Sequence, residues 1–262
     1  MKKIGILYIC TGEYSKFWND FYKSAEKYFL NDCEVHYFIF TDSDILLNLD
    51  KKMVHSIYSA NQDWPYPTLL RYETFNTNKK YFDRMDYLIF CNANLLFKEC
   101  INIDTLLANS KMFAVMHPGY IDKPIKDFPY EDNQKSLAYI NRSKNSKYFC
   151  GGFNGGKREY FLKMVDELNN NINIDLNNNI IAIWHDESHF NCYTEKNDSL
   201  FNILGSEFCH PEYRGLKPNI KVLVKDKDKE IGIRHKGLVY AGSYYIFKYL
   251  KIFKNVVTAF KK

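Results

Sequence analysis

Short apolar runs recur along the chain, and polar residues follow each of them. The runs lie at residues 3–10, 35–40, 87–91 and 113–116. Runs of this length are typical of buried β-strands. Behind the first run, apolar residues recur at helical spacing and predict a helix: Phe17, Phe21, Tyr22, Ala25, Tyr28 and Phe29. The amino end of the chain is therefore predicted to be a strand followed by a helix.

Strands that alternate with helical stretches predict an α/β fold with one open, mostly parallel sheet flanked by helices. In such a sheet, ligands bind beyond the carboxyl ends of the strands. Polar residues stand at those ends here: Thr11-Gly12, Thr41-Asp42, Asn92-Ala93-Asn94 and His117-Pro118-Gly119. We therefore expect the functional site along this edge of the sheet.

Two segments have a biased composition. Residues 169–179 are rich in asparagine and predict an exposed turn that takes no part in chemistry. Residues 151–156 hold four glycines but match neither the P-loop nor the dinucleotide-binding spacing. Two interpretations of the glycines stay open: a backbone that approaches a ligand where side chains would clash, or a tight pair of turns.

The chain of 262 residues, 46% of them hydrophobic, can bury one large core. We expect a catalytic domain over residues 1–236 and a tail over residues 237–262. The net charge of +5 is uneven, because residues 217–262 hold 12 Lys and Arg against 3 Asp and Glu, while the rest holds 24 against 28. This distribution argues against a nucleic-acid partner for the main body.

Seven cysteines without paired spacing predict neither a disulfide framework nor a zinc ribbon, and they favour a reducing compartment. The first apolar run is too short for a secretory core or a membrane span. We therefore expect a cytoplasmic protein.

A candidate catalytic group lies in the segment Trp184-His185-Asp186-Glu187-Ser188-His189. His185 and His189 are four residues apart, as in zinc proteases, but the acid occupies the third position of that motif instead of the second. A zinc hydrolase is therefore an alternative rather than the favoured interpretation. Glu187 as a lone carboxylate fits better, because Trp184 can stack on the apolar face of a sugar ring.

Together these motifs resemble glycosyltransferase family 6, the family of the histo-blood group A and B transferases and the α1,3-galactosyltransferase. The resemblance covers about residue 3 to about residue 230. The matching segments follow the family's order: Phe40-Thr41-Asp42, Arg71, Asn92-Ala93-Asn94, His117-Pro118-Gly119-Tyr120, Tyr130-Glu131, Ala138-Tyr139-Ile140, Gly151-Gly152-Phe153 with Gly155-Gly156, and residues 184–189.

The resemblance implies a Rossmann-like nucleotide-sugar transferase fold of the first structural class, and retaining α1,3 transfer of Gal or GalNAc from a UDP donor. It assigns these residues to the donor: Phe40, Thr41, Asp42, Arg71, Asn92, Asn94, Gly151, Gly152, Lys225 and Lys227. It assigns these to the acceptor or the transferred sugar: His117, Glu131, Trp184, His185 and Asp186. Glu187 is implied at the β face of the anomeric carbon, either as nucleophile or as stabiliser of an oxocarbenium ion.

The resemblance also bears on metal dependence. Vertebrate members carry Asp-Val-Asp at the triplet and need manganese, whereas bacterial members resemble this chain in having Asn-Ala-Asn and no metal dependence. Amide carbonyls are neutral and weaker ligands for a hard cation. We therefore expect no metal and no other cofactor, the UDP-sugar being a substrate.

Without a metal, the departing UDP needs Lys or Arg. Residues 225–229, Lys-Asp-Lys-Asp-Lys, are the candidate, since an extended chain would place three ammonium groups on one side. A solvated charged loop is the alternative.

The donor sugar is implied by the stretch Cys150-Gly151-Gly152, whose third residue in this family reads the 2-substituent of the sugar. Glycine there leaves room for an N-acetyl group and predicts UDP-GalNAc, with a fucosylated galactoside as acceptor. The family's Phe-Thr-Tyr-Glu-Arg-Arg appears as residues 128–133, Phe-Pro-Tyr-Glu-Asp-Asn, without the threonine and both arginines. The alternatives are a UDP-Gal-dependent α1,3-galactosyltransferase and a non-catalytic carbohydrate-binding protein.

Residues 245–260 place apolar side chains on one half of a helical wheel and lysines on the other. Such a helix can lie in an anionic membrane surface, which would suit an enzyme that builds lipid-linked glycans at the inner face of the membrane. A terminal helix packed on the domain is the alternative.

Overall fold

The structure is a computed structural model that describes residues 1–232. Residues 1–225 form one unit, and residues from 226 onward belong to another. The expected boundary between residues 236 and 237, and the amphipathic pattern of residues 245–260, lie outside the described residues. No helix among residues 1–232 is long and apolar enough to cross a membrane.

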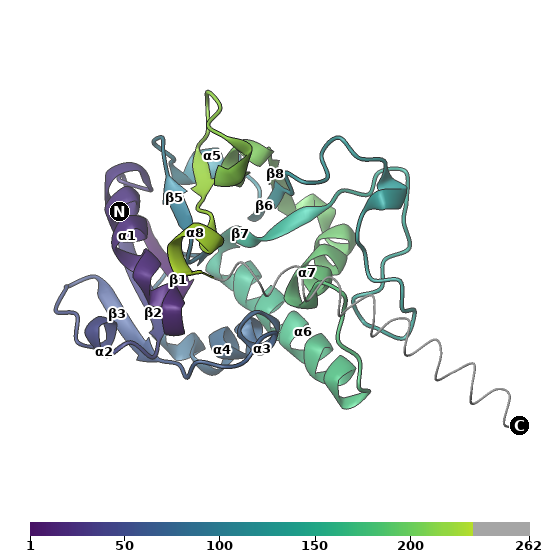
Figure 1. The fold of residues 1–262 in the computed structure, drawn as a ribbon, viewed down its shortest axis with the longest axis horizontal. Coiled ribbons are helices and arrows are strands. Elements are labelled where there is room, and N and C mark those ends of the chain that lie inside the picture. The colour runs from purple at the N-terminus through teal and green to yellow at the C-terminus, as the bar shows by residue number, and fades with distance from the viewer. Residues whose placement is uncertain (233–262) are drawn as a thin grey trace, which may run out of the picture. The chain divides into compact units, whose positions relative to one another are not determined.

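A seven-stranded sheet forms the centre of the first unit (Figure 1). Its strand order is β3-β2-β1-β4-β7-β6-β8. The strands are β1 (Lys3–Ile9), β2 (Glu34–Thr41), β3 (Val54–Tyr58), β4 (Tyr87–Asn92), β6 (Met112–Met116), β7 (Phe149–Lys157) and β8 (Phe201–Leu204). Only β7 runs antiparallel to its neighbours, β4 and β6. The predicted mostly parallel α/β fold is therefore confirmed.

A three-stranded sheet lies in the same unit. It consists of β5 (Leu95–Phe97), β9 (His210–Pro211) and β10 (Val222–Val224). The α-helices of the described residues are α1 (Trp18–Tyr28), α2 (Asp44–Leu47), α3 (Tyr66–Leu69), α4 (Arg71–Thr77), α5 (Ile103–Leu107), α6 (Arg158–Asn177), α7 (His185–Lys196) and α8 (Lys227–Ile231). The 3-10 helices span Gly12–Phe17, Lys79–Phe82, Ile125–Asp127, Asp198–Leu200, Ser206–Phe208 and Glu212–Arg214.

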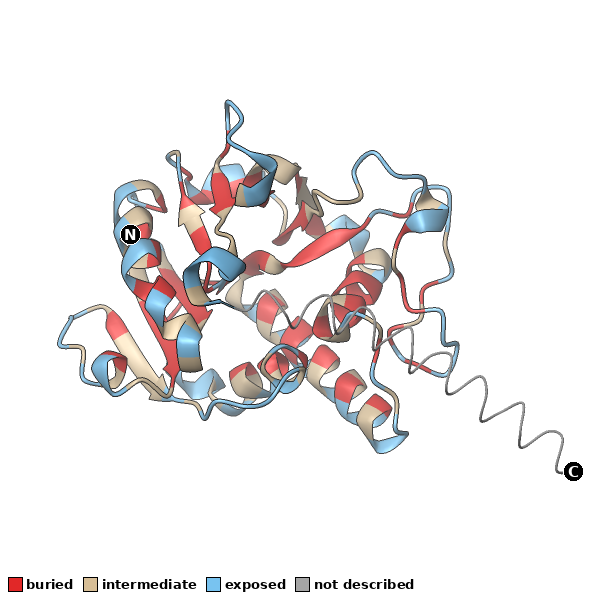
Figure 2. Ribbon diagram, viewed as in Figure 1, coloured by how far each residue is buried: buried red, intermediate tan, exposed pale blue. Residues whose placement is uncertain are grey.

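Alternation along the strands divides the core between the two faces of the sheet. Tyr8 of β1 packs against Trp18 and Phe21 of α1. Leu7, the preceding residue, belongs to a cluster shared with α4, α6 and α7. The strands are mostly buried (Figure 2). Burial on both faces explains why β1, β2, β4 and β6 are visible in the sequence as continuous apolar runs.

The expected turn at residues 169–179 is wrong, because α6 continues to Asn177. Leu168 and Ile172 are buried and Leu176 is partly buried, at a spacing of four residues along one helix face. This apolar spacing decides the structure in spite of the asparagines between them.

The glycine-rich stretch forms strand β7, so the interpretation as a pair of turns is wrong as well. A β-carbon on Gly155 would lie 2.6 Å from the carbonyl oxygen of Leu88, and one on Gly156 would meet the backbone of Lys111. The glycines therefore allow β7 to pack closely between its neighbours.

Candidate active site

The carboxyl ends of three strands bring the predicted polar residues to one edge of the sheet. In the register of the sheet, Ile9 pairs with Phe40 of β2 on one side and with Asn92 of β4 on the other. The residues that follow these positions are therefore neighbours, as expected for a ligand site in an open α/β sheet.

Two of the residues expected at the donor are buried inside the protein. Phe40 and Thr41 are fully buried, and the Phe40 ring packs against Phe75 and Phe82. The Thr41 hydroxyl donates to the carbonyl of Cys10 at 2.9 Å. These two side chains therefore shape the edge of the sheet and do not reach into open space.

Asp42 orders the loop after β1. Its carboxylate accepts the N–H of Gly12 at 2.7 Å. Gly12 has φ +55°, a conformation that glycine adopts without strain. The loop between β1 and α1 is thus tied to the end of β2.

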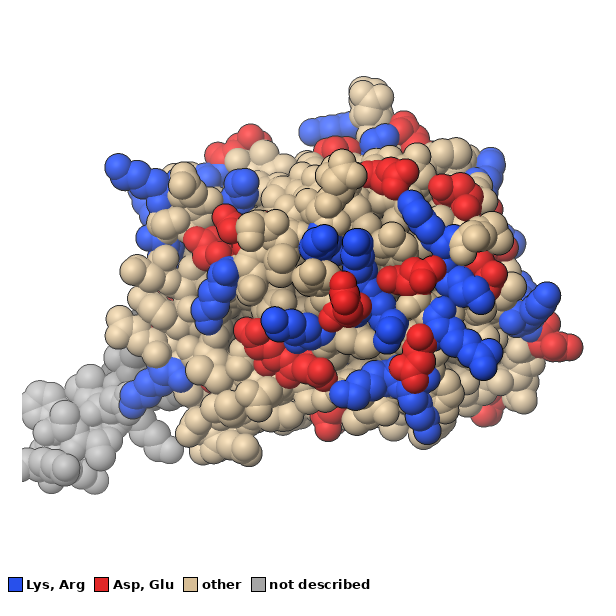
Figure 3. All heavy atoms as spheres, turned by 180° about the vertical axis from the view of Figure 1, so that it is seen from behind, with Lys and Arg blue, Asp and Glu red and all other residues tan. Residues whose placement is uncertain are grey.

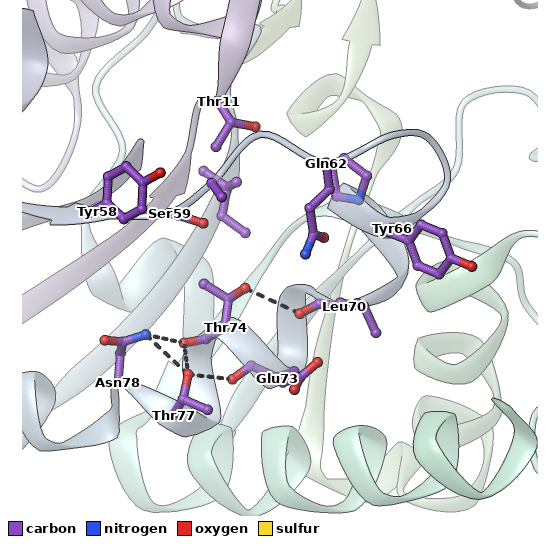
Figure 4. A pocket seen from close by; sticks show the side chains of 13 residues that line it. Thr11, Tyr58, Ser59, Gln62, Tyr66, Leu70, Glu73, Thr74, Thr77 and Asn78 are labelled. Carbon is purple, nitrogen blue, oxygen red and sulfur yellow. Dashed lines mark hydrogen bonds between the residues drawn. The ribbon is translucent and has the colours of Figure 1, made fainter. Parts of the chain in front are cut away.

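A pocket of about 280 Å³ opens beside this edge. Thr11 and the segment after β3 line one part of it, and α3 and α4 line the other (Figure 4). Its polar lining includes Thr11, Ser59, Gln62, Glu73, Thr74 and Asn78, and two tyrosines, Tyr58 and Tyr66, add aromatic surface. The motifs in the sequence did not point to these residues. For Thr11, Ser59 and Gln62, the available signal was their position after the carboxyl ends of β1 and β3.

Glu187 lies on the first turn of α7, and donors hold both oxygens of its carboxylate. The Tyr148 hydroxyl donates to Oε1 at 2.7 Å, and the Gly151 N–H donates to Oε2 at 2.7 Å. Burial raises the pKa of Glu187, while the two hydrogen bonds act in the opposite direction. The carboxylate is therefore fixed in position.

A buried ion pair lies next to Glu187. Arg71, the first residue of α4, meets the carboxylate of Asp186 at 2.7 Å, and both residues are buried. Arg71 also donates to the carbonyl of Gly151 at 2.8 Å. Burial raises the pKa of Asp186 to about 6 although Arg71 favours the charged form. Arg71 and Glu187 thus bond to the carbonyl and the N–H of the same β7 residue, Gly151, and Asp186 is joined to them through Arg71.

Gly152 lies against the first asparagine of the triplet. A β-carbon at this position would be 2.7 Å from Nδ2 of Asn92. Asn92 is exposed, whereas Asn94 is buried and donates through Nδ2 to the carbonyl of Lys225 at 2.8 Å. The two amides of the triplet therefore have different environments.

Of the two lysines assigned to the donor, Lys225 follows the end of β10 and Lys227 begins α8. The Lys225 ammonium lies 2.9 Å from Asp20 of α1. Lys227 begins α8, so the expected extended arrangement of residues 225–229 is wrong. Asp226 caps this helix by accepting the N–H of Asp228, which explains why the charged stretch turns helical.

Glu131, expected at the acceptor, uses both carboxylate oxygens on the backbone. It accepts the N–H of Ile183 at 2.7 Å and that of Asn133 at 2.8 Å. Trp184, next to Ile183, is 47% exposed. Glu131 therefore links the segment after Phe128 to the residue that presents the Trp184 ring.

The histidines surround the same region in neutral form. Burial lowers the pKa of His117 to about 4, and the ring lies 5.6 Å from that of Tyr148. Burial likewise lowers the pKa of His185 to about 4, and its ring packs nearly perpendicular to that of Trp64, with the ring centroids 4.7 Å apart. His185 has φ +53°, which is rare outside glycine and is common at functional sites.

The zinc alternative finds no geometric support. His189 is buried 3.5 Å from Asp175, whereas His185 contacts Trp64. Within residues 1–232, no three His, Cys, Asp or Glu side chains converge as metal ligands. The spacing of the two histidines therefore does not produce a protease-like metal centre.

Comparison with known proteins identifies similar chains. The model of "Glycosyltransferase family 6" matches residues 2–233. The O-antigen biosynthesis glycosyltransferase WbnI of Escherichia coli is 34% identical over 230 residues, which cover 87% of this chain and 96% of that protein.

Vertebrate proteins match over part of their length. The globoside alpha-1,3-N-acetylgalactosaminyltransferase 1 of Homo sapiens is 27% identical, over 86% of this chain and 67% of that protein. The histo-blood group ABO system transferase 1 of Rattus norvegicus is 29% identical, over 72% of this chain and 56% of that protein.

Proposed function

Because this chain belongs to glycosyltransferase family 6, we propose that it transfers GalNAc from UDP-GalNAc to a galactoside acceptor, with retention of configuration, in α1,3 linkage and without a metal ion. Membership makes the chain a glycosyltransferase of the blood-group and O-antigen type. The fixed carboxylate of Glu187, beside the buried pair of Arg71 and Asp186, is the observation that carries the proposal of catalysis.

Glu187 supports the positive charge that develops at the anomeric carbon. In the reaction the bond from the sugar C1 to the UDP oxygen breaks, and the acceptor oxygen bonds to C1. With a covalent intermediate, Glu187 attacks C1 as the UDP oxygen leaves, and the acceptor oxygen then displaces Glu187 while its proton passes to the departed UDP phosphate. With front-side attack, the departing phosphate takes the acceptor proton while the carboxylate stabilises the oxocarbenium ion. Both routes need the ionised carboxylate that Tyr148 and Gly151 hold.

The polar pocket beside Thr11 supports a place for the uridine. Tyr58 and Tyr66 offer aromatic surface to a base, and Thr11, Ser59 and Gln62 offer hydrogen-bonding groups. It adjoins the β1 edge, where Ile9 pairs with Asn92. We therefore assign the nucleoside to this pocket and the diphosphate to the edge beside Asn92.

The contact between Gly152 and Asn92 supports UDP-GalNAc. The space that a β-carbon at residue 152 would take is occupied by the Asn92 amide rather than left open, and this amide can donate to the carbonyl oxygen of a 2-acetamido group. The human relative is an N-acetylgalactosaminyltransferase by name, which agrees with this donor. By the family resemblance, the proposed acceptor is a fucosylated galactoside.

The triplet does not fit a divalent metal well. Asn92 and Asn94 add no negative charge, and hard cations favour carboxylates. The Asn94 Nδ2 donates to the Lys225 carbonyl, so this residue could offer a cation only its neutral carbonyl oxygen. The developing charge on UDP must then be met by the protein's own cations, with Lys225 and Lys227 as candidates.

The test is turnover by purified protein in the presence of EDTA. UDP-GalNAc and UDP-Gal are supplied separately with fucosylated galactosides such as fucosyllactose, and products are separated by chromatography. We expect faster transfer from UDP-GalNAc and no effect of the chelator. Faster transfer from UDP-Gal contradicts the proposed donor, and recovery of a lost activity on addition of Mn²⁺ contradicts metal independence.

Glu187→Gln tests the catalytic role. We expect transfer and donor hydrolysis to fall by about 100-fold or more, with donor affinity largely kept, because the amide cannot supply negative charge under the sugar. Glu159→Gln, an exposed residue of α6, is the matched control. A non-catalytic carbohydrate-binding protein would instead bind sugars and show no turnover before or after the substitution.

A further inference from the structure

Two hydrogen bonds join Asn94 to Lys225. The Asn94 Nδ2 donates to the carbonyl oxygen of Lys225 at 2.8 Å, and the Lys225 N–H donates to the carbonyl oxygen of Asn94 at 2.8 Å. Asn94 is 4% exposed. The side chain of this triplet residue is therefore buried and hydrogen-bonded to the main chain.

The bonds lie at the end of a strand pair. Strands β5 and β10 are antiparallel, with Leu95 opposite Val224. The contact between Asn94 and Lys225 adds one more pair to this ladder and ends it. Lys225 is also the last residue of the unit formed by residues 1–225. The contact therefore fixes the point from which the basic stretch 225–229 continues.

An aspartate at position 94 could not make this contact. An amide has N–H donors, whereas an ionised carboxylate accepts hydrogen bonds and donates none. Aspartate would place a charged oxygen against the Lys225 carbonyl and leave that carbonyl without its donor. The amide thus has a role here that a metal-binding aspartate cannot fill.

We propose that Asn94 is a positioning residue that acts through Lys225. It holds the main chain of Lys225 beside the end of β4, so that an asparagine in place of a metal-binding aspartate also fixes the position of a protein cation. The Lys225 ammonium is held 2.9 Å from Asp20, a carboxylate with which a diphosphate would compete. The kinetic consequence rests on the proposed function, whereas the hydrogen-bonding role does not.

The experiment is hydrogen–deuterium exchange of the full chain, followed in peptides that cover residues 221–229. We expect Asn94→Asp and Asn94→Ala to speed exchange there about five- to tenfold, because local opening becomes easier when the donor is lost. Asn92→Asp makes the same chemical change two residues away and is expected to leave exchange at residues 221–229 as in the native chain. Since Asn94→Ala adds no charge, it separates the lost donor from repulsion.

Kinetics provide the second measurement. The Asn94 variants are expected to raise the KM for UDP-GalNAc, and Mn²⁺ is not expected to restore it in Asn94→Asp. Lys225→Met keeps the main-chain bonds and is expected to raise the KM while exchange stays close to that of the native chain, so the proposal stays testable even if the Asn94 variants fold poorly.

Unchanged exchange in Asn94→Asp and Asn94→Ala, or rescue of Asn94→Asp by Mn²⁺, would overturn the proposal. A native chain without any transferase activity would overturn the proposed function instead, and the exchange measurement would still decide the role of Asn94.

Discussion

The carboxylate of Glu187 depends on its neighbours for its charge. Burial raises its pKa, and hydrogen bonds from Gly151 and Tyr148 favour the ionised form. The Gly151 donor belongs to the backbone and cannot be removed by substitution. The Tyr148 hydroxyl can be removed by substitution, so its removal tests what controls the charge state of Glu187.

Tyr148→Phe is expected to move the acid limb of the pH profile of kcat/KM to higher pH. The lost hydrogen bond had favoured the carboxylate, so its removal raises the pKa of Glu187 further, and activity is lost earlier as the pH falls. The measurement is the rate of GalNAc transfer across the acid range. Tyr81→Phe, at an exposed tyrosine of a 3-10 helix, serves as the control. An unmoved acid limb in Tyr148→Phe would show that another group controls it.

For single residues, the sequence predicted which side chains lie in the site but not which partners they contact. Motif order placed Arg71, Asp186 and Glu187 in one site, and the structure brings them together. The pairing of Asp186 with Arg71 arises from contacts between α4 and α7, which sequence spacing does not show. The family resemblance assigned Thr41 to the donor, yet its hydroxyl donates to the Cys10 carbonyl inside the sheet edge.

Helix α6 shows how one element supports another. Asp175, from its asparagine-rich half, is 2% exposed and accepts hydrogen bonds from the Ser136 hydroxyl at 2.5 Å and the Leu137 N–H at 3.0 Å. His189 of α7 lies 3.5 Å from the same carboxylate. Asp175 therefore ties α6 to the segment that follows Glu131 and to α7.

Asp175→Ala is expected to lower the free energy of unfolding by about 2–3 kcal/mol, because it leaves a buried hydroxyl and a backbone N–H without their acceptor. Denaturant titration measures this loss. Asn173→Ala, on the exposed side of the same helix, is expected to change stability by less than about 0.5 kcal/mol. Equal effects of the two substitutions would contradict a supporting role for Asp175.

Elements differed in how well the sequence predicted them. Strands β1, β2, β4 and β6 each contain a continuous apolar run because both their faces are covered, and each was predicted. Strand β7 consists largely of glycine and polar residues, FCGGFNGGK, whose strand conformation depends on close packing against Leu88 and Lys111. Composition alone therefore could not separate this strand from turns.

Charge is distributed unevenly along the sequence but evenly over one face of the molecule. On the face shown in Figure 3, Lys and Arg are interspersed with Asp and Glu, so this face has no surface of one sign. The basic excess of the sequence lies in residues 217–262. A role for this region at an anionic membrane stays a prediction, because residues 233–262 are outside the described part of the chain.

Deletion of residues 240–262 is expected to abolish binding to phosphatidylglycerol vesicles, which the full chain should bind more weakly as salt increases. Sedimentation of vesicles with bound protein is the measurement. Vesicles of phosphatidylcholine are the control, since they lack the negative charge that attracts lysine. If the shortened and full chains bind the vesicles equally, the amphipathic pattern of residues 245–260 has another role, such as packing on the domain.

Glu131 accepts main-chain N–H groups from two separate segments, one that follows Phe128 and one that leads to Trp184. These two segments are therefore held together by a single side chain. If one of these segments were replaced by that of a relative to alter sugar preference, the other segment would have to be replaced as well, or Glu131 would have to be retained.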